Sequence, residues 1–181
     1  MPYANTELLA NFYYIFSPMK KLDKIGLGGG CHWCTEAVFQ SLKGVHLVEQ
    51  GYIASEGIAA SFSEAVIVHY NPDIIILEDL IEIHLRTHKS KANHSFRKKY
   101  RSAIYYFTEN QHLEVKMAFS VFQNAANNQL ITQILKFNSF EASRESLLNY
   151  YKNNPEKPFC ERYITPKLDF LKSKYTEKIR P

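Results

Sequence analysis

The sequence lacks three features that would place it outside the ordinary globular proteins. No run approaches the roughly 18 consecutive apolar residues typical of a membrane-spanning helix. Seven glycines and seven prolines are too few for a collagen-like or linker-like chain. Three cysteines are too few, and odd in number, for a secreted domain held together by disulfides. We therefore expect neither a membrane protein, nor a fibrous protein, nor a disulfide scaffold.

What the sequence does contain is the composition of a folded domain. It has 181 residues, of which 45% are apolar, 14% aromatic and 22% charged. A chain of this length can bury a core without disulfides or metals, and we predict one domain over residues 19–181. Residues 1–18 are expected to be an N-terminal extension, because Met19 could be an alternative start. The extension has no basic segment and no Ala-x-Ala site, so we expect no signal peptide and a cytoplasmic location.

The net charge of +4 is unevenly distributed along the chain. One stretch holds seven basic residues and no acid: Arg86, Lys89, Lys91, Arg97, Lys98, Lys99 and Arg101. Such a stretch is compatible with a nucleic-acid interface or with a solvated loop. We favour the solvated loop and expect no nucleic-acid partner.

The spacing of apolar residues predicts alternating strands and helices. Period-two alternation over 62–70, where Glu64, Val66 and Val68 share one face, predicts a strand. A capping box, Thr108-x-x-Gln111, predicts a helix start. Strands are predicted at 24–29, 45–54, 62–70, 102–107 and 131–137, and helices at 31–43, 77–88, 108–127 and 141–152. The predicted fold class is α+β, a two-layer α/β sandwich with a ferredoxin-like core, a mixed sheet and an irregular C-terminal segment.

The strongest local signal is a glycine-rich turn that enters a helix with two cysteines: Gly28-Gly29-Gly30-Cys31-His32-Trp33-Cys34. Cys31 is placed where unpaired N–H groups and the positive end of the helix dipole stabilise a thiolate, which lowers the pKa of the thiol. The preceding glycines leave the sulfur accessible. We predict that Cys31 is a redox-active nucleophile.

The other two cysteines each allow more than one role. Cys34 can be the disulfide partner of Cys31, a small apolar core residue, or a metal ligand. Metal binding is disfavoured because the sequence offers only one Cys-x-x-Cys pair, so we expect no metal and no cofactor. Cys160, in a segment flanked by prolines, is either a resolving thiol that can approach Cys31 or an inert buried thiol.

Glu64 and Trp33 are further candidates. An apolar neighbourhood would penalise the ionised form of the Glu64 carboxyl, which suits a general acid. The opposite strand face, with Ala65 and Ile67, could equally be the buried one. Trp33 is the only tryptophan. It is either a core anchor or one wall of an apolar pocket beside Cys31.

Several motifs together resemble the peptide methionine sulfoxide reductase A family. That family typically shows Gly-Cys-Phe-Trp followed by a helix with an early Glu, and the chain has Gly30-Cys31-His32-Trp33 and then Glu36. Further similar segments follow in the same order: Gly51-Tyr52, Ser63-Glu64-Ala65-Val66, Tyr70-Asn71-Pro72, Tyr100-Arg101-Ser102-Ala103-Ile104-Tyr105, Asn154-Pro155, Phe159-Cys160 and Ile164-Thr165-Pro166-Lys167-Leu168. The resemblance covers about residues 24–170.

The resemblance implies a peptide-methionine (S)-S-oxide reductase, which reduces methionine-S-sulfoxide, free or in peptides, to methionine. Cys31 would attack the sulfoxide sulfur and become a sulfenic acid. Glu64 would give a proton to the sulfoxide oxygen, and Tyr100 would hydrogen-bond near it. His32 and Trp33 occupy the substrate-binding positions. We expect Cys31, Glu64 and Tyr100 to face one cavity.

Regeneration would require a second thiol. It would close a disulfide with Cys31, and thioredoxin would reduce that disulfide. Cys160 matches the family's C-terminal resolving position, whereas Cys34 is nearer in sequence. We prefer Cys160, because a bridge from i to i+3 strains an intact helix, but both assignments stay open.

The chain departs from the family pattern at four places. His32 stands where the family has Phe, and Ser95 where it has an acid. Leu147 and Leu148 stand where it has His-Gln. The connection between Tyr52 and Glu64 is short and lacks the loop that carries the family's second active-site tyrosine.

These departures keep two alternatives open. One is a catalytically weak or inactive member that acts as a binding module. The other is a general thiol–disulfide oxidoreductase that uses Cys31 and Cys34. We expect a monomer with no membrane partner.

Overall fold

The computed structural model describes residues 22–181, so the predicted N-terminal extension, residues 1–18, lies outside the described chain. The helices and strands, in chain order, are β1 (Asp23–Gly28), α2 (His32–Gln40), β2 (Val45–Ala54), β3 (Ser63–Tyr70), α3 (Leu77–Thr87), β4 (Ala103–Tyr106), α4 (Glu109–Ala125), β5 (Gln133–Lys136), β6 (Ser139–Ala142), α5 (Tyr150–Asn153) and α6 (Thr165–Lys174). Short 3₁₀ turns lie between several of them, and a π-helical turn, Cys160–Ile164, precedes α6.

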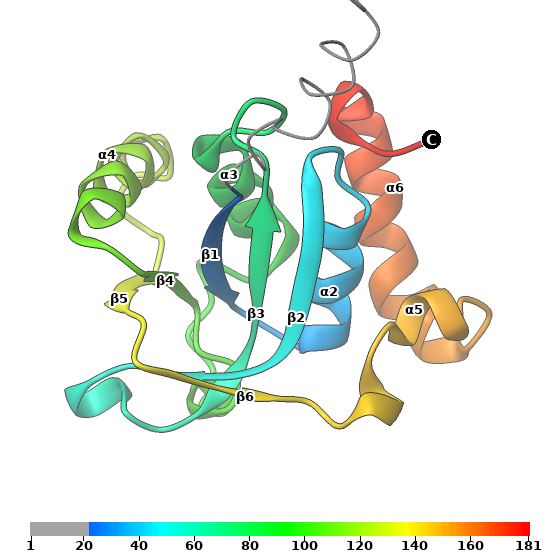
Figure 1. Cartoon of the computed structure of the whole chain (residues 1–181), viewed down its shortest axis with the longest axis horizontal. Helices are drawn as coiled ribbons and strands as arrows, with labels where there is room; N and C mark the ends of the chain where they lie inside the picture. Colours follow the sequence, from blue (N-terminus) through cyan, green and yellow to red (C-terminus); the bar gives the residue numbers. More distant parts are fainter. Residues whose placement is uncertain (1–21) are drawn as a thin grey trace, which may run out of the picture.

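The strands of the described chain form one mixed sheet, in the order β5-β4-β1-β3-β2-β6 (Figure 1). Neighbouring strands are antiparallel except β4 and β5, which are parallel. The inner order β4-β1-β3-β2, with α2 after β1 and α3 after β3, is that of a ferredoxin-like core. The predicted α+β fold class is confirmed, but the C-terminal segment is not irregular, because residues 158–174 are helical and the π-helical turn leads directly into α6.

Helices cover one face of this sheet and form the second layer. The main core joins side chains of β1 and β3 to α2, α3, α4 and α6. A smaller apolar cluster covers the other face: Ile53, Ala65, Ile67, Ala103 and Tyr105. The sheet is therefore buried on both sides near its centre.

Strand β3 shows this double burial most clearly. Val66 and Val68 belong to the helix-covered core, and Ala65 and Ile67 belong to the opposite cluster. The alternation of residues allowed either face of β3 to be the buried one, and the structure buries both. Glu64 lies on the face of Val66 and Val68, as predicted, and its carboxylate reaches the start of α2.

Local sequence signals explain two of the helix ends. Thr108 Oγ1 accepts the Gln111 N–H at 3.2 Å, and Gln111 Oε1 accepts the Phe107 N–H at 2.9 Å, so the predicted capping box opens α4. Gly44 follows α2 with φ at +83°, and a Cβ there would lie 2.8 Å from Ile75. The turn therefore requires glycine.

The predicted helix over residues 141–152 is wrong for most of its length. Residues 139–142 form the edge strand β6 on β2, and helix appears only at α5. A Cβ at Gly51 would lie 2.2 Å from the Glu141 carbonyl oxygen, so the missing side chain lets β6 approach β2. Tertiary pairing overrides the helical spacing here.

Candidate active site

Cys31 stands at the N-cap of α2, with φ −58° and ψ 126°. Its carbonyl accepts the N–H groups of Cys34 at 3.1 Å and Thr35 at 3.3 Å, which begins the helix. The residue is half-buried. A Cβ on Gly29 would meet the His88 ring at 2.5 Å, whereas one on Gly30 would meet nothing within 4 Å. The approach to Cys31 is open on the side of Gly30.

The two cysteines of α2 interact directly. A hydrogen bond from the Cys34 thiol lowers the pKa of Cys31, assisted by the backbone N–H groups at the helix start, while burial and the charge of Glu64 oppose the shift. The same hydrogen bond and burial raise the pKa of Cys34. Cys31 is therefore the more acidic thiol of the pair, and Cys34 the one that more readily keeps its proton.

Cys31 and Cys34 line a cavity of about 530 Å³. Aromatic side chains form much of its wall: Phe96, Tyr100, Phe159 and Tyr163. Lys167 also lines it. The Lys167 ammonium donates to the Thr87 carbonyl, burial lowers its pKa, and the two cysteines raise it. A cation thus lies within electrostatic reach of both thiols.

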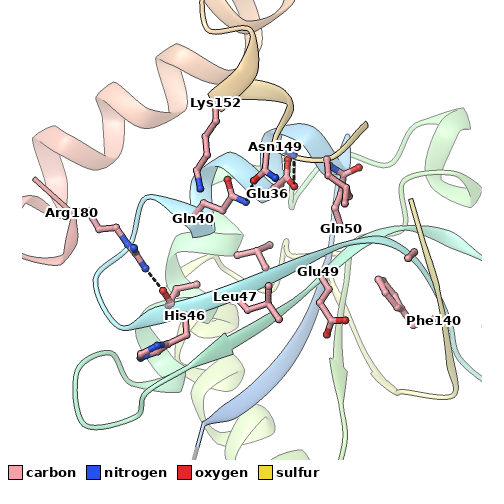
Figure 2. A pocket seen from close by; sticks show the side chains of 14 residues that line it. Glu36, Gln40, His46, Leu47, Glu49, Gln50, Phe140, Asn149, Lys152 and Arg180 are labelled. Atoms are coloured by element: carbon pink, nitrogen blue, oxygen red, sulfur yellow. Dashed lines mark hydrogen bonds between the residues drawn. The ribbon is translucent and has the colours of Figure 1, made fainter. Parts of the chain in front are cut away.

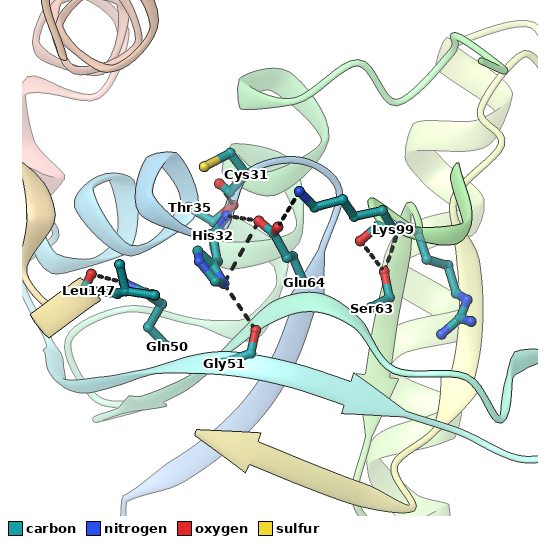
Figure 3. Close-up of polar contacts among 10 residues, drawn as sticks. Cys31, His32, Thr35, Gln50, Gly51, Ser63, Glu64, Lys99 and Leu147 are labelled. Atoms are coloured by element: carbon teal, nitrogen blue, oxygen red, sulfur yellow. Dashed lines mark hydrogen bonds and ion pairs between the residues drawn. The ribbon is translucent and has the colours of Figure 1, made fainter. Parts of the chain in front are cut away.

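Glu64 lies at the same helix start but is not among the residues that line this cavity. The Glu64 side chain is buried at 6% exposure, and its Oε2 accepts the His32 N–H at 3.1 Å. Oε1 lies 3.4 Å from Lys99 Nζ. In Figure 3 the Cys31 sulfur points away from this carboxylate. The cavity therefore unites Cys31 and Tyr100, and the expectation that Glu64 shares it is not met.

Lys99 links Glu64 to Tyr100. Its ammonium lies 5.0 Å from the centre of the Tyr100 ring. A hydrogen bond to Tyr100 and the charge of Glu64 raise the pKa of Lys99. The three side chains form a continuous polar chain beside the start of α2.

His32 is buried under the start of α2. Its Nδ1 lies 3.2 Å from the Gly51 carbonyl and 3.8 Å from Glu64 Oε2 (Figure 3). The ring packs edge-on against Tyr52, with centroids 5.4 Å apart. Because a carbonyl can only accept, Nδ1 carries the proton in this contact. His32 thus links Gly51 of β2 to Glu64 of β3, and it is not among the residues that line the cavity of Cys31.

Trp33 lies in an aromatic stack. Its ring is parallel to Tyr150 at 4.0 Å and perpendicular to Phe159 at 5.4 Å. It is half-buried and packs against the main core. Phe159 connects this stack to the cavity wall, which makes Trp33 a support of the wall.

Cys160 is fully buried in the π-helical turn before α6. Burial raises the pKa of its thiol. All three cysteines are free. Cys160 belongs to the same core as Cys34, yet it does not line the cavity.

A buried polar chain lies behind Gly29. His88 Nδ1 donates to the His84 carbonyl at 2.5 Å, and the Ser102 hydroxyl donates to His88 Nε2 at 2.7 Å. Ser102 Oγ lies 2.8 Å from Thr132 Oγ1, which completes the chain. Burial lowers the pKa of His88 to about 4 and that of His84 well below its usual range. Both histidines are therefore neutral near pH 7.

A second hollow, of about 450 Å³, follows the edge of β2 (Figure 2). Glu36 forms part of its wall, and its two carboxylate oxygens accept the N–H groups of Asn149 at 2.9 Å and Tyr150 at 3.3 Å. Among its described lining residues there is no thiol. The thiols of Cys31 and Cys34 line the first cavity instead.

Within residues 22–181, no cluster of three or more His, Cys, Asp or Glu side chains suits a metal ion. None of the helices in that range has the length and apolar character needed to cross a membrane.

A ferredoxin-like α+β domain with a thiol of lowered pKa at a helix start, and a second thiol hydrogen-bonded to it, is typical of a thiol-dependent redox protein. The family model of peptide methionine sulfoxide reductase matches residues 23–179. The chain is 32% identical to the peptide methionine sulfoxide reductase MsrA of Deinococcus radiodurans over 168 residues, which cover 84% of this chain and 82% of that protein. The chain belongs to the peptide methionine sulfoxide reductase family.

Solved structures support the fold. Mxr1 from Saccharomyces cerevisiae in reduced form is 23% identical, with a TM-score of 0.68, and the match covers 80% of this chain and 92% of that one. Mxr1 in complex with Trx2 has a TM-score of 0.58 at 23% identity, over 72% of this chain and 86% of that one.

Sequence reasoning overlooked several residues of the site. Lys167 appeared only as part of a C-terminal motif, although it lines the cavity. The four-residue spacing of His84 and His88 on one predicted helix could have revealed their pairing. Nothing local indicated that Tyr150 would stack on Trp33, because the two residues are far apart in sequence.

Proposed function

We propose that the chain reduces methionine-S-sulfoxide, free or within peptides, to methionine, with Cys31 as the nucleophile. The observation that carries the proposal is the Cys31 thiol at the open start of α2, with its pKa lowered, in a chain that belongs to the peptide methionine sulfoxide reductase family. The Cys31 thiolate attacks the sulfoxide sulfur, and the oxygen moves to Cys31. One proton is taken up, so the products are methionine and a Cys31 sulfenic acid. Sulfur in the substrate gains two electrons, and Cys31 loses two.

Glu64 is the proposed proton donor to the sulfoxide oxygen, and Tyr100 a hydrogen-bond donor to it. The polar chain from Glu64 through Lys99 to Tyr100 links the two groups, and Glu64 must take up a proton before it can donate one. Because the sulfur is turned toward Cys34, attack beside Glu64 requires rotation about the Cα–Cβ bond of Cys31 to another staggered rotamer. Removing a general acid costs about 10²–10⁴ in rate. Glu64→Gln should therefore reduce kcat/KM strongly, with partial recovery in Glu64→Asp.

The proposed substrate contacts of His32 and Trp33 are indirect. His32 holds Glu64 in place through its N–H and its ring, and Trp33 supports the wall through Phe159. Trp33→Phe keeps an aromatic ring in the stack but makes the ring smaller. Because Trp33 supports the cavity wall and does not contact the reacting atoms, this variant should raise KM more than it lowers kcat.

Resolution of the sulfenic acid requires a second thiol. We propose Cys34 as the first thiol to attack, because it hydrogen-bonds to the Cys31 thiol and because Cys31 is an N-cap outside the helical backbone conformation. Because Cys31 lies outside the helical turn, a Cys31–Cys34 disulfide strains the helix less than an i to i+3 bridge within an intact helix does. Attack of the Cys34 sulfur on Cys31 releases water and leaves a disulfide. Cys160, buried in the neighbouring core, would then attack the Cys34 sulfur, which forms a Cys34–Cys160 disulfide and releases the Cys31 thiol.

Peptide mapping after one turnover tests this order. A Cys31–Cys34 or a Cys34–Cys160 disulfide in the wild type, together with a Cys31–Cys160 disulfide in Cys34→Ser, would support it. A Cys31–Cys160 disulfide alone in the wild type would assign resolution to Cys160, as the sequence resemblance implies.

We propose a thioredoxin as the reductant of the final disulfide, consistent with the complex of Mxr1 with Trx2. Two electrons and two protons pass from the thioredoxin dithiol to the enzyme disulfide. A monomer and a cytoplasmic location are also proposed. Sedimentation of the reduced full chain as a dimer would overturn the proposed monomer. Recovery of the protein outside the cytoplasmic fraction of lysed cells would overturn the proposed location.

The test of the function is a thioredoxin-coupled assay with each sulfoxide epimer separately. We expect turnover of the S epimer, none of the R epimer, and none of either with Cys31→Ser. Absence of turnover of both epimers by the wild type would reject the function and leave the inactive binding module.

A general thiol–disulfide oxidoreductase is the second candidate, favoured by the contact between Cys31 and Cys34. It predicts that the oxidised chain transfers its disulfide to unrelated dithiol peptides as fast as it accepts electrons from thioredoxin. A methionine sulfoxide reductase should oxidise these dithiol peptides no faster than oxidised glutathione does.

A further inference from the structure

The walls of the Cys31 cavity extend beyond what one methionine side chain needs. Its volume of about 530 Å³ falls within the usual range of small-molecule sites, roughly 300–1,000 Å³. Phe96 is 65% exposed and Tyr163 is 47% exposed, and both line it. Large apolar surfaces left open at a cavity mouth mark a binding surface. They leave room for the residues on either side of an oxidised methionine.

The charge around this cavity has one sign. Lys89 and Lys167 line it, and no Asp or Glu is among its described lining residues. The stretch from Arg86 to Arg101, which supplies Lys89 and Phe96, holds no acid at all. Apart from the Cys31 thiol, the charged side chains that line the cavity are therefore basic.

Two cations of this stretch, Arg97 and Lys99, are held by neighbouring groups, whereas the Lys89 side chain is exposed. Arg97 donates to the carbonyls of Lys89, Ala92 and Tyr100, which holds the loop together. Lys99 pairs with Glu64. In the described chain no carboxylate lies within ion-pair distance of the exposed Lys89 ammonium.

We infer that this cavity selects peptide segments in which the oxidised methionine is flanked by Asp or Glu. Lys89 faces the acidic flank, and Phe96 and Tyr163 cover the aliphatic part of the peptide. The inference rests on the proposed function, since it concerns which methionine sulfoxides reach Cys31. Clefts of one charge raise the local concentration and association rate of oppositely charged ligands about 10–10³-fold, an effect that salt removes.

The experiment compares three capped peptides that differ only beside a central methionine-S-sulfoxide: Glu-flanked, Gln-flanked and Lys-flanked. Dithiothreitol serves as reductant, so thioredoxin recognition does not enter. At an ionic strength of about 0.01 M we expect kcat/KM for the Glu-flanked peptide to exceed that for the Lys-flanked one about tenfold or more, and the ratio to approach one at about 1 M. Equal kcat/KM for all three peptides at low salt would overturn the inference.

Variants locate the effect. Lys89→Gln should reduce the ratio between the Glu-flanked and Gln-flanked peptides several-fold. Lys116→Gln, which removes an exposed lysine of α4 outside the cavity, should leave that ratio unchanged. Equal ratios in the wild type and Lys89→Gln would assign the preference elsewhere and reject this surface.

Binding separates this inference from the proposed function. Fluorescence anisotropy of the same labelled peptides on Cys31→Ser measures affinity without turnover. Tighter binding of the Glu-flanked peptide would support the inference even if the wild type reduced nothing, in which case the proposed function alone would fail. Efficient turnover by the wild type, together with equal affinities of Cys31→Ser for the three peptides, would overturn the inference and leave the proposed function in place.

Discussion

Cys31 and Cys34 are three residues apart, yet their thiols have opposite properties. The Cys31 thiol has a lowered pKa because Cys34 donates a hydrogen bond to it and because it stands beside the free N–H groups of α2. The Cys34 thiol has a raised pKa because it is the donor and is buried. One side chain is therefore suited to attack, and the other keeps its proton until a sulfenic acid forms.

Replacing Cys34 should make Cys31 a weaker acid. In Cys34→Ala the hydrogen bond that contributes most to the lowered pKa of Cys31 is lost, so the pH midpoint of Cys31 alkylation by iodoacetamide should move upward. Mass spectrometry of the labelled Cys31 peptide measures this directly. Cys160→Ala is the matched control, because it removes a thiol outside the cavity, and its midpoint should equal that of the wild type. A Cys34→Ala midpoint at or below the wild-type value would contradict the assignment.

At the scale of elements, the chain after β5 shows why sequence reasoning was incomplete. The strands β1 to β5 and helices α2 to α4 follow local apolar spacing and caps, and were predicted close to their true bounds. The segment 139–153 instead depends on distant partners: β6 on the Gly51 region of β2, and α5 on Glu36. Such contacts leave no periodic signal in the local sequence.

The same distinction holds for the site. Cys31 was predictable from the glycines and the helix start, whereas the separation of Glu64 from the cavity depends on how α2 sits over β3. Sequence alternation placed Glu64 on the correct face, but it could not show that the His32 N–H and Lys99 would hold its carboxylate.

Glu36 should be the main support of α5. Its buried carboxylate, 2% exposed, holds the first N–H groups of that short helix. Glu36→Ala leaves both donors without a partner, so we expect a loss of about 2–4 kcal/mol in the free energy of unfolding. Urea denaturation followed by the fluorescence of Trp33, which stacks on Tyr150, measures the loss. Glu36→Gln, with one acceptor left, should lose less.

A surface control completes this experiment. Glu114→Ala removes an exposed carboxylate from α4 and should change stability by no more than about 0.5 kcal/mol. A Glu36→Ala loss as small as this would mean that water replaces the carboxylate, and that α5 is held by the aromatic stack alone.

In the molecule as a whole, helices cover one face of the sheet and a smaller apolar cluster covers the other. The helix-covered face is mostly apolar, but it includes His84 and His88 between α3 and the sheet. These rings are neutral in the folded chain because burial disfavours their charged forms. Their desolvation links the stability of the entire fold to pH.

The sign of this linkage follows from the two protonation states. The pKa of His88 is about 4 in the folded chain and 6.5 in its ordinary state. Between these values the unfolded chain binds a proton that the folded chain does not, so acid favours unfolding. The contribution is complete above pH 6.5 and is lost as the pH falls toward 4. His84 acts in the same direction.

We therefore expect the free energy of unfolding to decrease on acidification from pH 7 to pH 5, with about 2 kcal/mol of the decrease due to His88. Urea denaturation at several pH values gives the slope for the wild type and for His88→Gln. The glutamine can still donate to the His84 carbonyl but does not titrate, so its slope should be smaller by that amount, even if the variant is less stable at pH 7. Parallel slopes for the two proteins would show that His88 takes up a proton without unfolding, which would require the chain through Ser102 and Thr132 to reverse its hydrogen bonds.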